Sequence, residues 1–291
     1  MKQVLVLKNP MRDLQYQMME EVIAFLTKNE VHVFVIEEET HSFSSPVSSY
    51  HGKEKMDFAI FLGGDGTILQ FANRFYQEEF LYYGINLGRV GVLAEADKEN
   101  WKEKITSILR GNYFVERRNT LDICVKNEEG QKQVHGLNEV AILRGNRLSM
   151  MRVNFAVETQ GKASCYADGI LVSTSTGSSA YSLSVGGSLI LPTSPVFSIS
   201  PINPQIKTFV PIIVPEDNAI SLSIESEKER EAYQKEPSPL VVVDGRDHFP
   251  ILPGDEVVVK KGEKDLKVIK TNRNASLYLP IDKVMKAGKE E

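Results

Sequence analysis

The stretch "FLGGDGTILQ", residues 61–70, places three glycines and one aspartate between two apolar segments. The apolar run "DFAIFL" leads into it, and Ile68, Leu69 and Ala72 follow at helical spacing. We therefore expect a strand, a glycine loop and a helix, in that order. In an open α/β sheet this is where ligands bind, and glycine amides at a helix N-terminus suit a phosphate group.

The aspartate in this loop, Asp65, needs an explanation of its own, because a carboxylate repels phosphate. It fits a general base that takes a proton from a hydroxyl, or a ligand of Mg²⁺ that bridges phosphates. The alternative is an ordinary strand-to-helix turn in which Asp65 and Thr67 cap the helix. The spacing fits neither GxGxxG nor GxxxxGK[ST], so the Rossmann and Walker arguments do not apply.

The chain of 291 residues is long enough for about two domains. Its first part alternates strand-like and helix-like segments, and from Arg118 to "LKVIK" the apolar residues alternate with period two. We predict an α/β domain with a parallel sheet over 1–117, then an all-β, antiparallel, sandwich-like domain over 118–270. The sequence leaves open whether the tail, 271–291, forms a helix that returns to the first domain.

Two details of the first domain are specific enough to check. Residues 11–28 are expected to form a helix whose apolar face consists of Leu14, Met18, Val22, Phe25 and Leu26. Residues 40–56 are polar, with serine clusters and a proline, and are expected to form a mobile loop without regular structure.

Composition and charge exclude several classes of protein. The net charge of -5 argues against a nucleic-acid binder. No apolar segment approaches the roughly 18–20 residues of a membrane span, and the N-terminal run is too short for a signal peptide. Cys124 and Cys165 form no CxxC pair, so we expect two reduced thiols, and with the two observations above we expect a cytoplasmic protein. The histidines are scattered and form no cluster with the cysteines, so we expect no metal held by protein ligands.

A second motif is the segment "DGILVSTSTGSSAYSLSVGG", residues 168–187. Its Ser, Thr and Gly content is compatible with a flexible linker. However, apolar runs bracket it, and Tyr181 and Leu183 lie inside it. Small residues allow the backbone to wrap a flat ring and a tyrosine can pack on the ring face, so a nucleotide-binding loop is the other interpretation.

Two shorter motifs also contain carboxylates. Asn138 and Glu139 lie between apolar strand residues in "HGLNEVAI"; alone, such a pair is usually a solvated strand face, although an amide and a carboxylate can also bind a vicinal diol. The stretch "VVVDGRD", 241–247, fits a hairpin turn at Asp244-Gly245, and we assign it no function.

Taken together, these motifs resemble those of a known family. GGDGT resembles the signature shared by NAD kinases and the diacylglycerol/sphingosine-type lipid kinases, and it is close to the phosphofructokinase loop. The segment 168–187 resembles the long NAD-kinase motif D-G…S/T-x-x-G-S/T-S/T-A-Y-S-L-S-x-G-G, for which we know no lipid-kinase counterpart. The resemblance to the NAD kinase family covers about 60–270, with departures at Val92, where the family has phenylalanine, and at Gln205, where it usually has histidine.

The resemblance implies phosphoryl transfer, with Mg²⁺ or another divalent cation, from ATP or polyphosphate to the adenosine ribose 2′-hydroxyl of NAD, giving NADP. It implies that Asp65 is the general base or orients that hydroxyl, and that Asn138 and Glu139 bind ribose hydroxyls. The phosphate-holding residues it implies are Gly64, Gly66 and Thr67. The nucleotide-binding residues it implies in the Ser-rich segment are Thr176, Ser179, Ala180, Tyr181, Ser182, Leu183 and Ser184.

In this family the aspartate that matches Asp168 contacts dinucleotide from a neighbouring subunit, which implies a homo-oligomer, a dimer or a tetramer. The expected partners are therefore NAD, ATP and further copies of the chain, with no nucleic acid and no membrane. Two alternatives remain open: a GGDGT-type lipid kinase, and a non-catalytic NAD(P) sensor.

Overall fold

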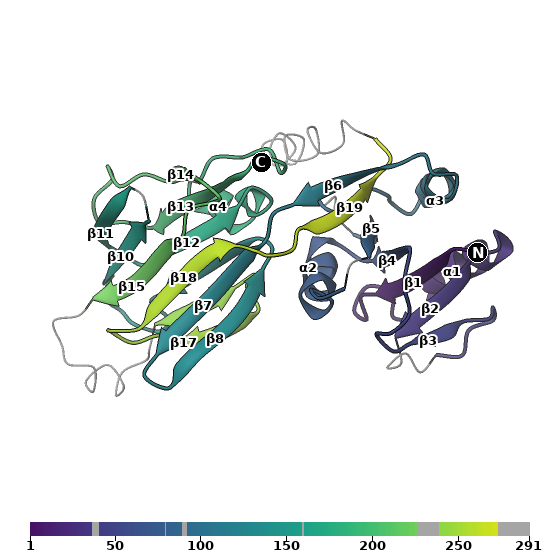
Figure 1. Ribbon diagram of the computed structural model, residues 1–291, viewed down its shortest axis with the longest axis horizontal. Helices are drawn as coiled ribbons and strands as arrows, with labels where there is room; N and C mark the ends of the chain where they lie inside the picture. Colours follow the sequence, from purple (N-terminus) through teal and green to yellow (C-terminus); the bar gives the residue numbers. More distant parts are fainter. Residues whose placement is uncertain (37–40, 79, 89–91, 159, 226–238, 273–291) are drawn as a thin grey trace. The chain divides into compact units, whose positions relative to one another are not determined.

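The computed structural model describes residues 1–36, 41–78, 80–88, 92–158, 160–225 and 239–272. The chain divides into two compact units (Figure 1): Met1–Arg117 together with the segment from Leu266, and Arg118–Asp265. Each unit has a hydrophobic core of its own. Among the described residues, no helix combines the length and the apolar character needed to cross a bilayer.

The first unit is built on a seven-stranded sheet with the order β3-β2-β1-β4-β5-β19-β6. Its strands are β1 (Gln3–Lys8), β2 (His32–Ile36), β3 (Ser48–Tyr50), β4 (Phe58–Leu62), β5 (Leu81–Ile85), β6 (Phe114–Arg118) and β19 (Leu266–Lys270). Every pair of neighbours from β3 to β19 is parallel. The prediction of a parallel sheet in an N-terminal α/β domain is confirmed.

Within the described residues, three helices accompany this sheet: α1 (Gln17–Lys28), α2 (Asp65–Arg74) and α3 (Trp101–Leu109). Buried residues of α1 and α3 share one core cluster with Ile60 of β4. Successive strand residues point to opposite faces, and the next residue, Phe61, meets Phe71 of α2 with ring centroids 5.7 Å apart. The helix after the glycine loop therefore packs on the other face of β4.

The first helix differs from its predicted form. It begins at Gln17, and its buried residues are Met19, Val22, Ile23 and Leu26. Leu14 precedes the helix and is 75% exposed. Both sets of apolar residues have helical spacing, so periodicity alone did not determine which one faces the sheet.

The expected loop over 40–56 contains a strand, which corrects that prediction. Ser48–Tyr50 forms β3 and pairs with β2 in parallel, from Phe34 with Ser48 to Ile36 with Tyr50. Tyr50 is buried, while the serines occupy the edge of the sheet. An edge strand of three residues is too short to give a period-two pattern in the sequence.

The strand "LKVIK" corrects the predicted domain assignment. We expected it to close the β domain at 270, but β19 lies next to β5 in the first sheet, with Val268 opposite Tyr82. Its apolar residues fit a strand in either domain, so the sequence pattern could not choose. Most of the tail, 273–291, lies outside the described residues.

The second unit consists of two six-stranded antiparallel sheets. One has the order β11-β10-β15-β18-β7-β8, with β7 (Leu121–Asn127), β8 (Gly130–Gly136), β10 (Met151–Val157), β11 (Gly161–Ala167), β15 (Ile220–Glu225) and β18 (Glu256–Lys261). The other has the order β14-β13-β12-β9-β16-β17, with β9 (Glu139–Leu143), β12 (Gly169–Thr174), β13 (Val196–Ile202), β14 (Ile212–Pro215), β16 (Leu240–Val243) and β17 (Asp247–Pro250).

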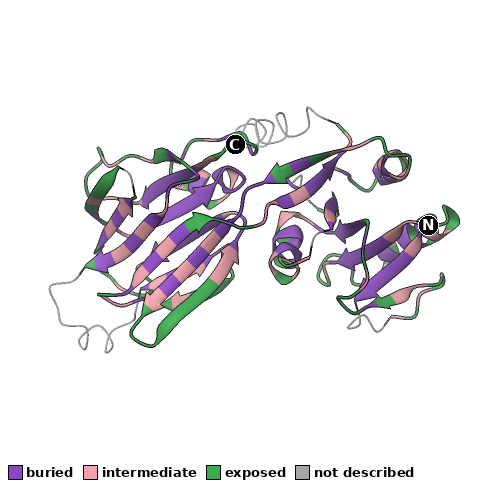
Figure 2. Ribbon diagram, viewed as in Figure 1, coloured by how far each residue is buried: buried purple, intermediate pink, exposed green. Residues whose placement is uncertain are grey.

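One core cluster is shared by both sheets, with Ile123 and Leu222 from the first and Val140 and Val172 from the second. Figure 2 shows the stripes of buried and less buried residues along β7, β15 and β18 that follow from a period of two. The prediction of an antiparallel all-β C-terminal domain is confirmed.

Candidate functional site

The glycine loop of the first unit joins β4 to α2, and its glycines differ in what they do. A Cβ on Gly63 would lie 2.2 Å from Thr67 Oγ1, so the turn closes only with glycine there. Thr67 is buried, and its Oγ1 accepts a hydrogen bond from Asn9 Nδ2 at 3.0 Å. A Cβ on Gly66, in contrast, would meet no atom within 4 Å. Gly63 and Thr67 thus stabilise the turn, whereas packing gives no reason for glycine at 66.

Asp65 is the first residue of α2, and its side chain does not cap the helix. The carboxylate instead accepts backbone N–H groups from beyond the next strand: Oδ2 from Val92 at 2.7 Å, and Oδ1 from Leu93 at 3.0 Å and Ala94 at 3.4 Å. The interpretation as an ordinary capped turn is therefore wrong. The aspartate is held at the carboxyl end of a parallel sheet, where ligands bind in this kind of fold.

In the second unit, Asn138 and Glu139 lie at the start of β9, and Asp244 fixes their backbone. Asp244 Oδ2 accepts the N–H of Leu137 at 2.8 Å, and its Oδ1 accepts those of Asn138 at 2.7 Å and Glu139 at 3.1 Å. Asp244 has a φ of 49° and Gly245 a φ of 67°, so the predicted turn is present between β16 and β17. We had assigned this turn no function; its aspartate orients the Asn-Glu pair.

Glu139 is not on a solvated strand face, because it is only 7% exposed. Burial, and after it the charge of Asp244, raises the pKa of Glu139 to about 7, against the opposing effect of a hydrogen bond from the Tyr181 backbone N–H. Among the described residues, the Glu139 Oε2 atom is buried without a hydrogen-bond partner. In its protonated form, a carboxyl group can donate a hydrogen bond to one sugar hydroxyl and accept one from another.

The Ser-rich segment is folded into the interior, so the linker interpretation is wrong. It continues β12 into a 3₁₀ turn, η1 (Gly177–Ser179), and a short helix, α4 (Tyr181–Ser184). The side chains of Thr174 and Ser178 are fully buried and bond to the backbone: Thr174 Oγ1 to the Leu137 carbonyl at 2.6 Å, and Ser178 Oγ to the Ser175 carbonyl at 2.7 Å. Where the chain leaves the sheet, these hydroxyl groups make hydrogen bonds to backbone carbonyls in addition to those between paired strands.

The same segment lies directly against the Asn-Glu pair. The backbone N–H of Thr174 donates to the Asn138 carbonyl at 2.9 Å. A Cβ on Gly177 would lie 2.1 Å from that oxygen, so only glycine allows the approach. Two motifs about 35 residues apart in sequence thus share backbone contacts, with the Tyr181 amide on the Glu139 carboxyl group as a further link.

The predicted nucleotide-binding residues differ in exposure. Thr176 and Ser182 are buried, and a Cβ on Gly187 would lie 2.4 Å from the Ser182 hydroxyl. Tyr181 and Ser184 are exposed, and the remaining three, Ser179, Ala180 and Leu183, are half-buried. Tyr181 is 36% exposed, and burial followed by the charges of Glu139 and Asp168 raises the pKa of its phenol.

Asp168 lies between β11 and β12 and is held by two side chains. Its Oδ1 pairs with Arg144 Nε at 3.0 Å, and its Oδ2 accepts from Asn203 Nδ2 at 3.0 Å. Its charge acts on Tyr181, so it belongs to the same surroundings as Glu139. Of the two departures from the family pattern, Val92 is buried with its amide on Asp65, and Gln205 is exposed and donates its backbone N–H to the Tyr166 carbonyl.

Within the described part of the chain, no three His, Cys, Asp or Glu side chains are grouped to hold a metal ion. Both Asp65 oxygens already accept backbone N–H groups.

Comparisons with known proteins agree with both units. The model of the ATP-NAD kinase N-terminal domain matches residues 4–113, and that of the ATP-NAD kinase C-terminal domain matches residues 137–271. An NAD kinase from Magnetococcus marinus is 35% identical over 217 residues, which are 74% of this chain and 69% of the relative.

Two solved structures have the same fold. An NAD kinase from Archaeoglobus fulgidus in complex with ATP has a TM-score of 0.74 at 25% identity, covering 95% of this chain and 96% of that one. A yeast NADH kinase complexed with NADH has a TM-score of 0.84 at 24% identity, covering 98% of this chain and 88% of that one. The two family models account for most of the sequence and contain both the GGDGT loop and the Ser-rich segment, so the chain belongs to the NAD kinase family.

Proposed function

We propose that this protein is an NAD kinase. It transfers the terminal phosphoryl group of ATP, or of polyphosphate, to the 2′-hydroxyl of the adenosine ribose of NAD and so makes NADP. The observation that carries the proposal is the match of both NAD kinase domain models to a chain that keeps Asp65 at the end of β4 and Glu139 beside the Ser-rich segment. The ATP in the Archaeoglobus relative supports ATP as the donor.

In this reaction Asp65 accepts the proton of the 2′-hydroxyl, or orients that hydroxyl, as its oxygen attacks the terminal phosphorus and ADP leaves. The N-terminus of α2, with Gly64 and Gly66, binds phosphates through the backbone; the buried hydroxyl of Thr67 supports this loop from inside. A divalent cation bound with the donor would neutralise part of the charge of its phosphates. Phosphoryl transfer depends mainly on positioning and electrostatics, which a small set of fixed groups can supply.

In the second unit, Asn138 and Glu139 bind the ribose hydroxyls, and the Ser-rich segment forms the adenine pocket. The support is chemical: Asp244 holds the backbone N–H groups of Asn138 and Glu139. These residues carry an amide and a carboxyl group whose pKa is raised to about 7. Tyr181, partly exposed, is available to pack on a ring, and the half-buried residues of the segment are the better candidates for direct contact than the buried Ser182.

The protein is proposed to act as a homo-oligomer in the cytoplasm. Asp168 would contact dinucleotide bound to a neighbouring subunit. Exposed Ile212 and Ile213 on β14, one of the two edge strands of its described sheet, support contact with a second copy. The two cysteines, Cys124 and Cys165, are free, which is compatible with a reducing compartment.

The test is Asp65→Asn, which keeps the size of the side chain and removes the base. Turnover of NAD to NADP should fall by about 10²–10⁴-fold while NAD still binds. Asn138→Ala is the comparison, because it removes a ground-state contact and should chiefly raise the KM for NAD. Near-normal NADP production by Asp65→Asn would rule out its role, and an Asn138→Ala variant impaired only in kcat would rule out ribose binding.

A substrate comparison separates this proposal from its rivals. Purified protein with ATP and Mg²⁺ is given NAD or diacylglycerol. Phosphorylation of the lipid would indicate a lipid kinase, and NAD binding without product would indicate a sensor. Replacing ATP by polyphosphate in the same assay identifies the donor.

A further inference from the structure

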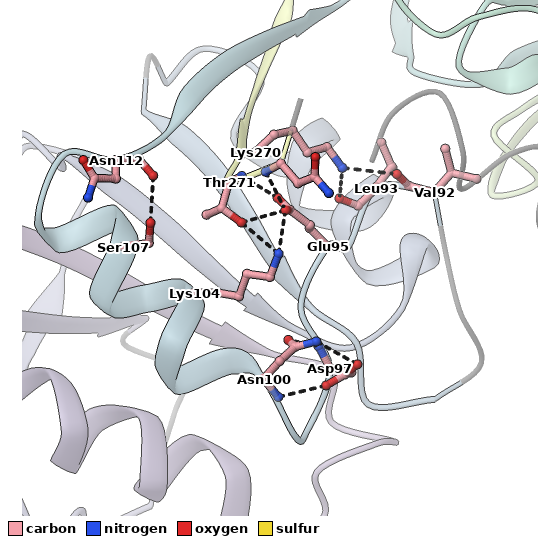
Figure 3. A network of polar contacts seen from close by, with 11 residues as sticks. Val92, Leu93, Glu95, Asp97, Asn100, Lys104, Ser107, Asn112, Lys270 and Thr271 are labelled. Atoms are coloured by element: carbon pink, nitrogen blue, oxygen red, sulfur yellow. Dashed lines mark hydrogen bonds and ion pairs between the residues drawn. The ribbon is translucent and has the colours of Figure 1, made fainter. Parts of the chain in front are cut away.

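Lys270, the last residue of β19, is fully buried and has no part in the proposed mechanism. An ammonium group in the interior needs compensating acceptors. Its Nζ lies 3.4 Å from the carbonyl oxygen of Val92 and 3.3 Å from that of Leu93 (Figure 3). Both acceptors belong to the segment whose amides hold Asp65.

The two sets of hydrogen bonds share the same peptide groups. The Val92 carbonyl and the Leu93 N–H belong to one peptide unit, and the Leu93 carbonyl and the Ala94 N–H to the next. The oxygen of each unit faces the Lys270 ammonium, and its N–H faces Oδ1 of Asp65. A cation on one side and a carboxylate on the other polarise such a unit in the same direction, so each bond strengthens the other.

The surroundings hold this arrangement in place. A Cβ on Gly84 of β5 would lie 2.8 Å from Ala94 Cα, so glycine lets the segment lie against the sheet. Immediately after Lys270, the Thr271 backbone N–H and hydroxyl both donate to Glu95, at 2.8 and 2.7 Å. Lys104 pairs with the same carboxylate at 3.0 Å (Figure 3). The end of β19 is thus attached to residues 92–95 at two successive positions.

We propose that Lys270 is a positioning residue for Asp65 and acts on it through these two peptide groups. The inference rests on the proposed role of Asp65 as base or orienting group. The lysine fixes the direction of the Leu93 and Ala94 amides, and these fix the carboxylate toward the acceptor hydroxyl. The C-terminal strand therefore contributes to the rate of a step whose catalytic residue lies some 200 residues earlier in the chain.

The experiment is a double-mutant cycle of Lys270→Met and Asp65→Asn on the full chain, with NADP formation measured under saturating ATP and NAD. Methionine keeps the length and removes the charge and the donors. Lys270→Met alone should lower kcat by about 10- to 100-fold, the typical cost of a misplaced catalytic group, with the Kd for NAD nearly unchanged. In the Asp65→Asn background it should cause no further loss, since a residue that acts through Asp65 has nothing left to position.

Two further variants separate positioning from folding. Lys104→Met removes the other lysine of this network, whose Nζ contacts Glu95 and Thr271. It should cost stability and should lower kcat by less than Lys270→Met does. Lys270→Arg keeps the charge and the donors and should retain most of the rate. Thermal unfolding of each variant establishes that the assayed protein is folded.

The outcomes are distinguishable. Additive losses in the cycle, or a folded Lys270→Arg protein as slow as Lys270→Met, would overturn this inference and leave the proposed function standing. Near-normal turnover of Asp65→Asn alone would overturn the role of Asp65 and the inference with it.

Discussion

Glu139 and Asp244 are neighbouring carboxyl groups with different surroundings. Asp244 accepts three backbone N–H groups, which suit a full negative charge. Glu139 is buried beside the charge of Asp244 and accepts only the backbone N–H of Tyr181 among the causes that act on its pKa. Burial is the largest of these causes and raises the pKa to about 7. One residue therefore holds the backbone while the other changes its charge near neutral pH.

This arrangement predicts a pH-dependent stability. The pKa of Glu139 is raised from 4.5 to about 7, so between these values the folded protein holds a proton that the unfolded chain has released. The contribution to the free energy of unfolding is present at low pH and is lost as the pH rises through this window. Glu139→Gln cannot ionise and should be more stable than the natural protein by about 1–3 kcal/mol above pH 7, with little difference at about pH 5. Urea denaturation at about pH 5 and above pH 7 measures the free energy of unfolding of both proteins. If this free energy changed with pH by the same amount in both proteins, the raised pKa of Glu139 would be contradicted.

At the scale of elements, the strand–loop–helix unit that holds Asp65 separates glycines needed for folding from glycines available for binding. Gly63→Ala should destabilise the protein by about 1–3 kcal/mol, because its Cβ would overlap Thr67. Gly66→Ala meets open space within α2 and should be neutral or stabilising by up to about 1 kcal/mol. It should nevertheless raise the KM for ATP, since a methyl group keeps a phosphate away from the backbone. Thermal unfolding and steady-state kinetics of both variants test this split; unchanged kinetics for Gly66→Ala would place the phosphates elsewhere.

The elements also show how far the sequence could be followed. "DFAIFLGGDGT" predicted β4, the loop and α2, because an apolar run, glycines and helical spacing are local signals. The contacts of the Asp65 carboxylate could not be predicted, since its partners are amides some 27–29 residues away. The Asp-Gly turn was visible as a turn, but the contacts of Asp244 were not, since the amides that it accepts lie 105–107 residues away. Nothing in "LKVIK" indicated that its last residue, Lys270, is buried or that it contacts the segment that holds Asp65.

At the scale of the whole molecule, the path of the chain gives the first unit two separate pieces. The chain leaves the first sheet after β6, forms the sandwich from Arg118 to Asp265, and returns to the first sheet as β19. The carboxylate proposed to act on the acceptor hydroxyl and the lysine proposed to position it therefore come from segments on either side of the second unit in the sequence. The first unit is completed only after the second has been synthesised.

This path predicts which unit a mutation near the C-terminus will weaken. Val268 of β19 and Val259 of β18 are only nine residues apart and are 1% and 0% exposed. Truncation of either to alanine should cost about 1–3 kcal/mol.

Val268→Ala should speed backbone amide exchange in β4 and β5 and leave the sandwich protected, because β19 pairs with β5. Val259→Ala, the matched control, should speed exchange in β7 and β15, the two neighbours of β18. Exchange followed by mass spectrometry separates the two patterns, and faster exchange in β7 and β15 on truncation of Val268 would mean that the two units open as one.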